Sequence, residues 1–452
     1  MASKDILRLG CGAGFSSDRL EPAIDLARDG RLDYLVFETI GERTLAFGHR
    51  DRKLDPKRGY NPQLAARMRG VLRHCRDNKT RIVTNMGVAN VVAAAEVVVG
   101  IARELGLHGL KVACVEGDDV TSMLTPGTVL FDHGNRTIAE VGRPVVGANV
   151  YLGIDAILPA LETGADVVIT GRVADPSLFL SPLVHHFGWA QDDWTLMGRG
   201  TLVGHLMECG MQITGGYFAD PGFKDVPRPA DCGYPIAEAS ADSNVVITKL
   251  ATAGGVVSSR TVKEQLLYEV HDPAAYLTPD VAADISEATV TELGSDRVRL
   301  DGVRGHARPT HLKVNLCHES GWLAEGEISY AGARAEARAR LAADTLRKRL
   351  AGLALRVDLI GAVSILGDDT GRRLAATPEG GARDVRLRVA ATHEDRAEAE
   401  RLAREVMALY TCGPAGGGGV RTALTPRLNT ISCLLPREAV PVRFEIVEEG
   451  QA

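Results

Sequence analysis

The 452-residue sequence lacks the features that mark several common classes of protein. Its eight cysteines are scattered and none lies in a CxxC pair, which argues against a zinc ribbon or an iron–sulfur ligand run. The sequence has no apolar run long enough to span a bilayer, and its start lacks a secretory signal pattern. These absences predict a cytoplasmic protein that does not act at a membrane and whose cysteines are mostly reduced and structural.

An excess of positive charge is also missing. The 52 lysines and arginines stand against 58 aspartates and glutamates, a net charge of -6, and no basic block is interleaved with aromatics. Nucleic acid is therefore not expected as a partner, and we expect a small-molecule substrate instead. With 45% hydrophobic and 24% charged residues, the chain can build two large domains, and its many Ala, Val and Leu residues favour a homo-oligomer.

Short apolar runs alternate with helical segments in the first half of the chain. The expected strands there are 6–10, 34–38, 81–85, 110–115, 145–151 and 166–170. Such alternation predicts an α/β domain with a mainly parallel sheet, which we favour as doubly wound over a barrel. From about Cys232 onward, short turns between strands predict an α+β domain with mostly antiparallel strands. The predicted domains are residues 1–231 and 232–452.

Candidate site residues follow the expected strands, because ligands of open α/β sheets bind beyond the carboxyl ends of the strands. Arg172 and Asp175 follow the run 167–170, and Glu38 ends the expected strand 34–38. A glycine turn with Gly12, Gly14 and Phe15 follows the first strand and could present free N–H groups to an anion. It resembles a dinucleotide-binding turn, but the third glycine of that pattern falls on Phe15, so NAD is disfavoured. Another phosphate or a carboxylate is the more favoured ligand, and a plain turn without a ligand is the alternative.

Two further strand ends carry amides and acids. Asn85 and Asn90 could orient a carbonyl or carboxylate, although Asn90 is equally explained as a helix cap. Asp118 and Asp119 suit a general acid/base pair or a Mg²⁺ site, and equally suit a helix cap. No spacing in the sequence identifies a metal, so the cofactor stays open, with a divalent metal as one possibility.

A short helix is expected over 204–212, followed by a flexible turn at Thr214 and Gly215. His205 and Glu208 fall on one stripe of this helix, because positions three apart are neighbours. Such a pair can act as a proton relay or as part of a metal site. From residue types alone, the favoured interpretation is a structural hydrogen-bonded pair that ties the helix to the sheet.

Several blocks together resemble the acyclic terpene utilisation protein AtuA family, long known as a domain of unknown function. The blocks are VTNMGVA (83–89), GDD (117–119), TGRVADPSL (170–178), GHLMECGMQITGGYF (204–218), TVKEQLLYEVHDP (261–273) and YTCGPAGGGG (410–419). The resemblance implies a role in the catabolism of acyclic terpenes and branched acids, whose intermediates are acyl-CoA thioesters. Longer relatives add a carboxyl-terminal module of ferredoxin-like type, which this chain is expected to lack.

The favoured function is an enzyme of branched acyl-CoA or carboxylic acid catabolism, with hydro-lyase or lyase chemistry. The acids and His205 would move protons, and Arg172 would hold a carboxylate or enolate. A non-catalytic subunit that binds acyl-CoA or docks a partner is one alternative, and an NAD(P)-dependent oxidoreductase is another. The predicted catalytic residues are Glu38, Asp118, Asp119, Arg172, Asp175, His205 and Glu208, and the predicted substrate-binding residues are Gly12, Gly14, Phe15, Asn85, Asn90, Thr214 and Gly215.

Overall fold

The structure, a computed structural model, describes residues 6–448 of the chain. The chain divides into two compact units, of which the second is His318–Asn429 and the first holds the residues before and after it. The predicted boundary after residue 231 falls inside the first unit, whose main sheet contains strands from both halves of the sequence. No helix within residues 6–448 is both long enough and apolar enough to cross a bilayer.

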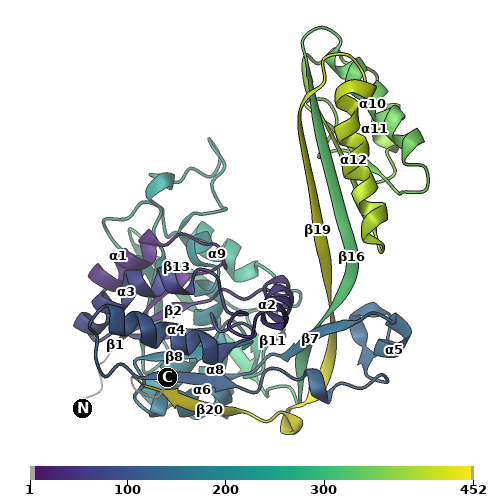
Figure 1. Ribbon diagram of the computed structural model, residues 1–452. Coiled ribbons are helices and arrows are strands. Elements are labelled where there is room, and N and C mark those ends of the chain that lie inside the picture. Colours follow the sequence, from purple (N-terminus) through teal and green to yellow (C-terminus); the bar gives the residue numbers. More distant parts are fainter. Residues whose placement is uncertain (1–5, 449–452) are drawn as a thin grey trace. The chain divides into compact units, whose positions relative to one another are not determined.

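A ten-stranded mixed sheet forms the centre of the first unit (Figure 1). Its parallel middle has the order β1 (Ile6–Ala13), β2 (Tyr34–Phe37), β3 (Arg81–Thr84), β8 (Val167–Thr170) and β4 (Val112–Glu116). Antiparallel strands extend it beyond β1 with β9 (Pro235–Ser240), β10 (Val245–Lys249), β14 (Arg297–Asp301) and β13 (Thr289–Gly294), and beyond β4 with β20 (Arg443–Val447). The predicted α/β class is confirmed, and the sheet combines parallel and antiparallel strands.

The strands of the parallel middle are buried on both faces, as their continuous apolar runs predict. In β2, Tyr34 and Val36 pack into one hydrophobic core, whereas Leu35 and Phe37 pack into another. The first core is completed by α6 (Ile154–Glu162), α7 (Ser177–Phe187), α8 (Trp194–Met207) and α9 (Ser259–Leu267), and the second by α1 (Glu21–Asp29), α3 (Leu64–Asn78) and α4 (Val91–Glu104) (Figure 1). Helices therefore cover both faces and leave the strand ends free to form a site.

Smaller elements surround this sheet. They are α2 (Glu42–Leu54), β5 (Val129–Leu130), β6 (Arg136–Thr137), α5 (Ile138–Val141), β7 (Val145–Val150), β11 (Tyr276–Leu277), β12 (Ala282–Asp284) and β15 (Arg304–His306), with 3₁₀ turns at Thr121–Met123, Phe131–His133, Gly210–Thr214, Pro229–Asp231 and Arg437–Ala439. Strand β7 pairs with β16 (His311–Ala331), and β11, β12 and β15 form a separate small sheet.

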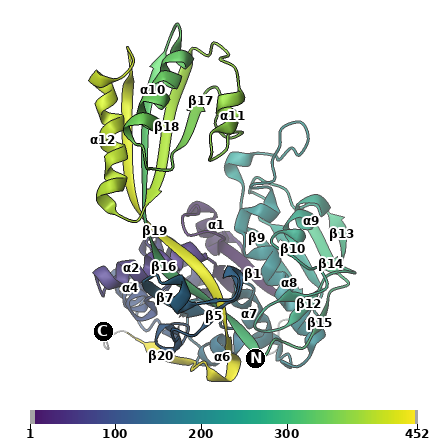
Figure 2. The same cartoon turned by 90° about the vertical axis from the view of Figure 1, so that its right-hand side faces the viewer.

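The second unit is built from α10 (Ala335–Arg349), β17 (Arg356–Ile360), α11 (Arg372–Ala376), β18 (Asp384–His393), α12 (Arg396–Cys412) and the parts of β16 and β19 (Gly418–Pro436) that lie within His318–Asn429 (Figure 2). The first residues of β16 and the last of β19 belong to the first unit. Its sheet has the order β17-β18-β16-β19, and α10 and α12 share one core with alternate residues of β18. Apart from the short α11, this is the β-α-β-β-α-β arrangement of ferredoxin-like domains. The family resemblance predicts a ferredoxin-like unit only at the carboxyl terminus of longer relatives. The structure has a unit with this arrangement inside the chain, at His318–Asn429.

Candidate functional site

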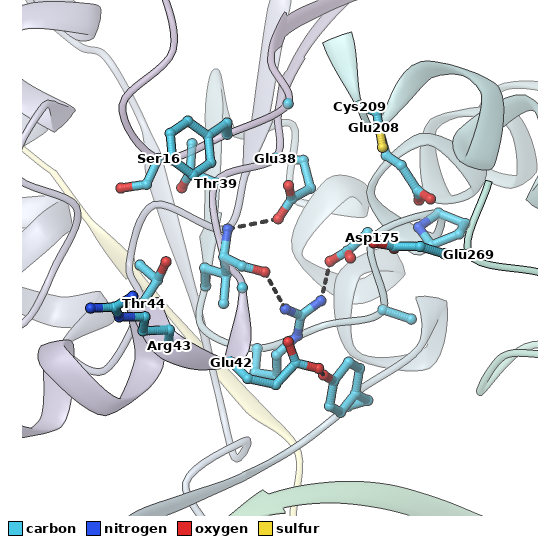
Figure 3. A pocket seen from close by; sticks show the side chains of 18 of the residues that line it. Ser16, Glu38, Thr39, Glu42, Arg43, Thr44, Asp175, Glu208, Cys209 and Glu269 are labelled. Carbon is cyan, nitrogen blue, oxygen red and sulfur yellow. Dashed lines mark hydrogen bonds and ion pairs between the residues drawn. The ribbon is translucent and has the colours of Figure 1, made fainter. Parts of the chain in front are cut away.

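A cavity of about 1490 Å³ lies at the carboxyl ends of the parallel strands of the first unit. Its walls come from the segments that follow β1, β2 and β8, from the end of α8, from β11 and from the first residues of β16. Ligand pockets usually measure about 300–1000 Å³, so this cavity has room for more than a small acid. Figure 3 shows Glu38, Asp175 and Glu208 reaching the same part of it from three different elements.

Glu38 follows β2 and is buried at the cavity wall. Its Oε1 accepts hydrogen bonds from the backbone N–H of Ile40 at 2.6 Å and from Asn85 Nδ2 at 2.9 Å. Asn85 follows β3, lies beneath the wall and also accepts a hydrogen bond from the N–H of Thr39 at 2.8 Å, so it orients Glu38. Burial and the neighbouring charge of Asp175 raise the pKa of Glu38 well above its usual value, and Arg172 opposes this shift.

Arg172 and Asp175 form an ion pair in the turn after β8. The guanidinium of Arg172 is 1% exposed, donates to the carbonyls of Val173 and Ile40 as well as to Asp175, and lies 4.3 Å from the centre of the Tyr151 ring. Asp175 is 34% exposed, and it lines the cavity. Burial raises the pKa of Asp175 to about 7; Arg172 lowers it and Glu208 raises it further.

Asp118 lies behind this turn and is buried. Its Oδ2 accepts hydrogen bonds from the backbone N–H of Arg172 at 2.7 Å and from Asn149 Nδ2 at 2.8 Å. A Cβ atom on Gly171 would lie 2.3 Å from the same oxygen, which explains the glycine at that position. Burial raises the pKa of Asp118 to about 6. Asp118 thus supports Arg172 from behind, while the cavity wall is formed by other residues.

Glu208 and His205 lie at the end of α8 and form the hydrogen bond that their helical spacing predicts. His205 Nδ1 donates to Glu208 Oε1 at 2.9 Å, and His205 Nε2 donates to the carbonyl of Leu266 at 3.3 Å. Both ring nitrogens can donate at once only in the protonated form of the imidazole, so these two oxygen atoms favour that form. Burial lowers the pKa of His205, but the hydrogen bond and charge of Glu208 outweigh it, and the pKa is raised. Glu208 lines the cavity and His205 lies behind it.

A second group of side chains lines the cavity near Arg172. The Tyr151 hydroxyl donates to Glu42 Oε1 at 2.5 Å, and Lys313 Nζ lies 3.5 Å from the same oxygen and 5.0 Å from the Tyr151 ring centre. Burial raises the pKa of Glu42, but Tyr151 and Lys313 outweigh it, and the pKa is lowered. The surroundings of Glu42 therefore favour its charged form, whereas those of Glu38 disfavour it.

The remaining predicted residues divide between the cavity wall and other places. Gly14 and Phe15 line the cavity, and a Cβ atom on Gly14 would lie 2.3–2.5 Å from backbone atoms of residues 208–210. The close approach of the first strand end to the Glu208 turn therefore requires glycine. The Gly14 N–H donates to Asp18 Oδ2 at 3.1 Å, so this amide is already engaged.

Five predicted residues lie elsewhere, each with a local structural partner. Gly12 packs against the Phe37 ring, and Thr214 donates to the carbonyl of Gly233 at 2.6 Å. The others form turns and caps: Asp119 Oδ1 accepts from the N–H and hydroxyl of Thr121, Asn90 caps α4, and Gly215 ends a 3₁₀ turn with φ of 108°. Within residues 6–448, no three His, Cys, Asp or Glu side chains are arranged to hold a metal ion.

Sequence reasoning did not predict Tyr151, Lys313 or Tyr276 at the site. Tyr151 follows the strand 145–150 directly, so the rule that found Glu38 and Arg172 could have found it. Lys313 and Tyr276 come from the second half of the sequence, and no local pattern indicates that these segments reach the strand ends.

The fold and the cavity define the class: a mixed α/β protein with a large, acid-lined cavity at the carboxyl ends of its parallel strands. The chain belongs to the acyclic terpene utilisation family AtuA, whose family model matches residues 7–446. No curated protein matches the chain. Among solved structures, the de novo designed protein Foldit4 matches 24% of this chain and 97% of its own, with 15% identity and a TM-score of 0.16, too low to support an inference.

Proposed function

We propose that the protein is an enzyme that adds and removes protons on a branched carboxylic acid or its acyl-CoA thioester, in a hydro-lyase or lyase reaction. The observation that carries this proposal is the meeting of Glu38, Asp175 and Glu208 in one cavity. Burial raises the pKa of Asp175 to about 7, so this carboxyl can hold a proton near neutral pH, and burial also raises the pKa of Glu38 above its usual value. Carboxyl groups tuned in this way are typical of general acids.

The three carboxyls differ in what stabilises their charged form, which suggests a division of roles. Glu208 is hydrogen-bonded to His205, whose pKa is raised, and is the best candidate for the base that removes a proton from carbon. Asp175 can return a proton to a leaving hydroxyl, which then departs as water while the carbon–carbon double bond forms. Hydration is the same sequence reversed: Asp175 takes a proton from the attacking water, and Glu208 returns one to the carbon.

Arg172 has a different role from the one its sequence position suggests. Its guanidinium is occupied by two carbonyls and Asp175 and is almost wholly buried. We assign it to positioning Asp175 and setting its charge, rather than to holding a substrate carboxylate. The family's description and the size of the cavity support a substrate with a branched hydrocarbon chain.

Solvent deuterium exchange tests this proposal without knowledge of the product. The full-length protein is incubated in D₂O with a panel of branched and unbranched acyl-CoA esters and free acids. The mass of each compound is then measured by mass spectrometry. At least one compound should gain deuterium or change mass by one water, and Glu208→Gln should abolish this. Asp119→Asn, an exposed acid outside the cavity, is the matched control and should leave the rate unchanged.

Two outcomes would contradict the proposal. If the wild-type protein binds an ester by calorimetry but exchanges no deuterium in any compound, it acts as a binding subunit. If exchange continues unchanged in Glu208→Gln, Asp175→Asn and Glu38→Gln, the three carboxyls do not carry the chemistry.

A further inference from the structure

We propose that the cavity receives the hydroxyl group of a ligand with an extended hydrocarbon chain, and that Glu208 Oε2 accepts the hydrogen bond from that hydroxyl. This inference rests on the proposed function in using the same cavity, and it adds the chemical class of the group that enters it. A hydroxylated substrate also suits a hydro-lyase, because a hydroxyl is the group that such an enzyme removes.

The first evidence is an unpaired oxygen. Glu208 is 10% exposed and lines the cavity; its Oε1 accepts from His205, but its Oε2 is buried and has no hydrogen-bond partner within residues 6–448. An unpaired acceptor on a buried carboxylate costs free energy, so native proteins rarely leave one. A hydrogen-bond donor from a ligand would satisfy it.

The second evidence is the charge of the cavity. Among the described residues, seven aspartates and glutamates line it, against three arginines and lysines, Arg43, Arg172 and Lys313. Arg172 is occupied by protein carbonyls and Asp175, and Lys313 lies beside Glu42. Arg43 lies over the Phe47 ring, on the side of the cavity away from Glu208 (Figure 3). A ligand carboxylate or phosphate near Glu208 would meet carboxyl groups without a free cation and would bring no donor for Oε2. An anionic head group is therefore disfavoured at this end of the cavity.

The third evidence separates a hydroxyl from an ammonium group. Asp175 reaches the same part of the cavity as Glu208 (Figure 3), and with a pKa of about 7 it carries a proton in a large share of molecules at neutral pH. A hydroxyl can donate to Glu208 and accept from protonated Asp175 at the same time. An ammonium group has donors only and would leave the Asp175 proton unpaired.

The hydrocarbon part follows from the rest of the cavity. Phe15 and Leu277 line it and are 64% and 67% exposed, and Phe131 and Leu434 line it with about half of their surface exposed. Large apolar side chains exposed around one cavity commonly mark a binding surface. A hydrocarbon chain of the ligand would cover them while its hydroxyl reaches Glu208.

Calorimetric titration of the full-length protein with octanol, octanoate and octylamine at neutral pH tests the inference. The three probes share one chain and differ only in the head group. Octanol should bind at least about tenfold more tightly than octanoate, the ratio expected for one hydrogen bond to a charged group, and more tightly than octylamine. Glu208→Gln should weaken octanol about tenfold and reduce its advantage over octanoate, whereas Asp119→Asn should change neither.

Tighter binding of octanoate or octylamine than of octanol, or no binding of octanol, would overturn the inference. If Glu208→Gln does not fold, the ranking of the three probes on the wild-type protein decides alone. The outcome is separable from the proposed function. A preference for octanol without deuterium exchange supports the hydroxyl site and contradicts the proposed enzymatic function. Deuterium exchange without a preference for octanol supports the enzymatic function and contradicts the hydroxyl site.

Discussion

Removing the charge of Arg172 should change the pH range over which the cavity transfers protons. Burial raises the pKa of Asp175 to about 7, and Arg172 is the main group that opposes this rise. An opposite charge in direct contact typically lowers a carboxyl pKa by about 1–3 pH units, so Arg172→Met should move the pKa of Asp175 to above about 8. Arg172→Lys keeps a positive charge and should leave it within about one pH unit of the wild-type value.

The assay is the rate of deuterium exchange, or of turnover once a substrate is known, measured across pH. If protonated Asp175 is the acid, the wild-type rate falls as the pH rises through about 7. In Arg172→Met this fall should occur at higher pH. The variant should also lose about 2–4 kcal/mol of unfolding free energy, because the buried carbonyls of Val173 and Ile40 lose their donor. Arg43→Met is the matched control, since Arg43 lines the same cavity and its guanidinium lies over Phe47 instead.

Equal displacement of the profile by Arg172→Met and Arg172→Lys would refute this reasoning, since geometry and not charge would then be responsible. A profile that stays in place in Arg172→Met would show that Asp175 is not the titrating acid. A shift in Arg43→Met as large as that in Arg172→Met would show that the effect depends on the general potential of the cavity.

Further predictions concern stability and packing. Asp118→Ala should lower the unfolding free energy in urea by about 2–4 kcal/mol, because two buried donors lose a charged acceptor, whereas the exposed Asp119→Ala should cost less than about 1 kcal/mol; equal losses would contradict this. The pKa of Asp118 is raised from 3.8 to about 6 in the folded state. The stability that protonation of Asp118 adds to the folded state is therefore complete below pH 3.8 and is lost as the pH rises to about 6. The melting temperature of the wild type, relative to that of Asp118→Asn, should fall across this pH range. Gly14→Ala should displace the Glu208 turn and reduce deuterium exchange, while Gly100→Ala, in an open part of α4, should raise stability by about 0.5–1 kcal/mol; an unchanged exchange rate in Gly14→Ala would contradict the close approach.

The parts of the site that could be predicted depend on short-range rules. Apolar runs located β2 and β8, and the side chains after them, Glu38, Arg172 and Asp175, do line one cavity. Helical spacing also predicted that His205 and Glu208 meet. Both rules use only neighbouring residues, since strand direction and helical periodicity are local properties.

The parts that could not be predicted depend on long-range pairing. Strand β16 runs without a break through Gly321, although a glycine inside an apolar segment usually marks a turn. Strand β19 contains Pro426 and begins in a glycine-rich stretch that suggests a connector. Asp119 and Asn90 follow strands, as the residues of the cavity wall do, but they form a turn and a helix cap. The sequence could not separate the two cases, because turns, caps and sites use the same residue types.

The pairing of β20 with β4 has a consequence for biosynthesis. Arg443 in β20 bonds to Glu116 in β4, and the two residues are 327 positions apart in the chain. At about 5–20 residues per second, a ribosome needs roughly 16–65 s to make the intervening segment. During that time β4 has an unpaired edge, and the second unit can fold before the first is complete. Nascent chains stalled before residue 443 should therefore bind chaperones that recognise exposed strand edges, and release them when β20 emerges.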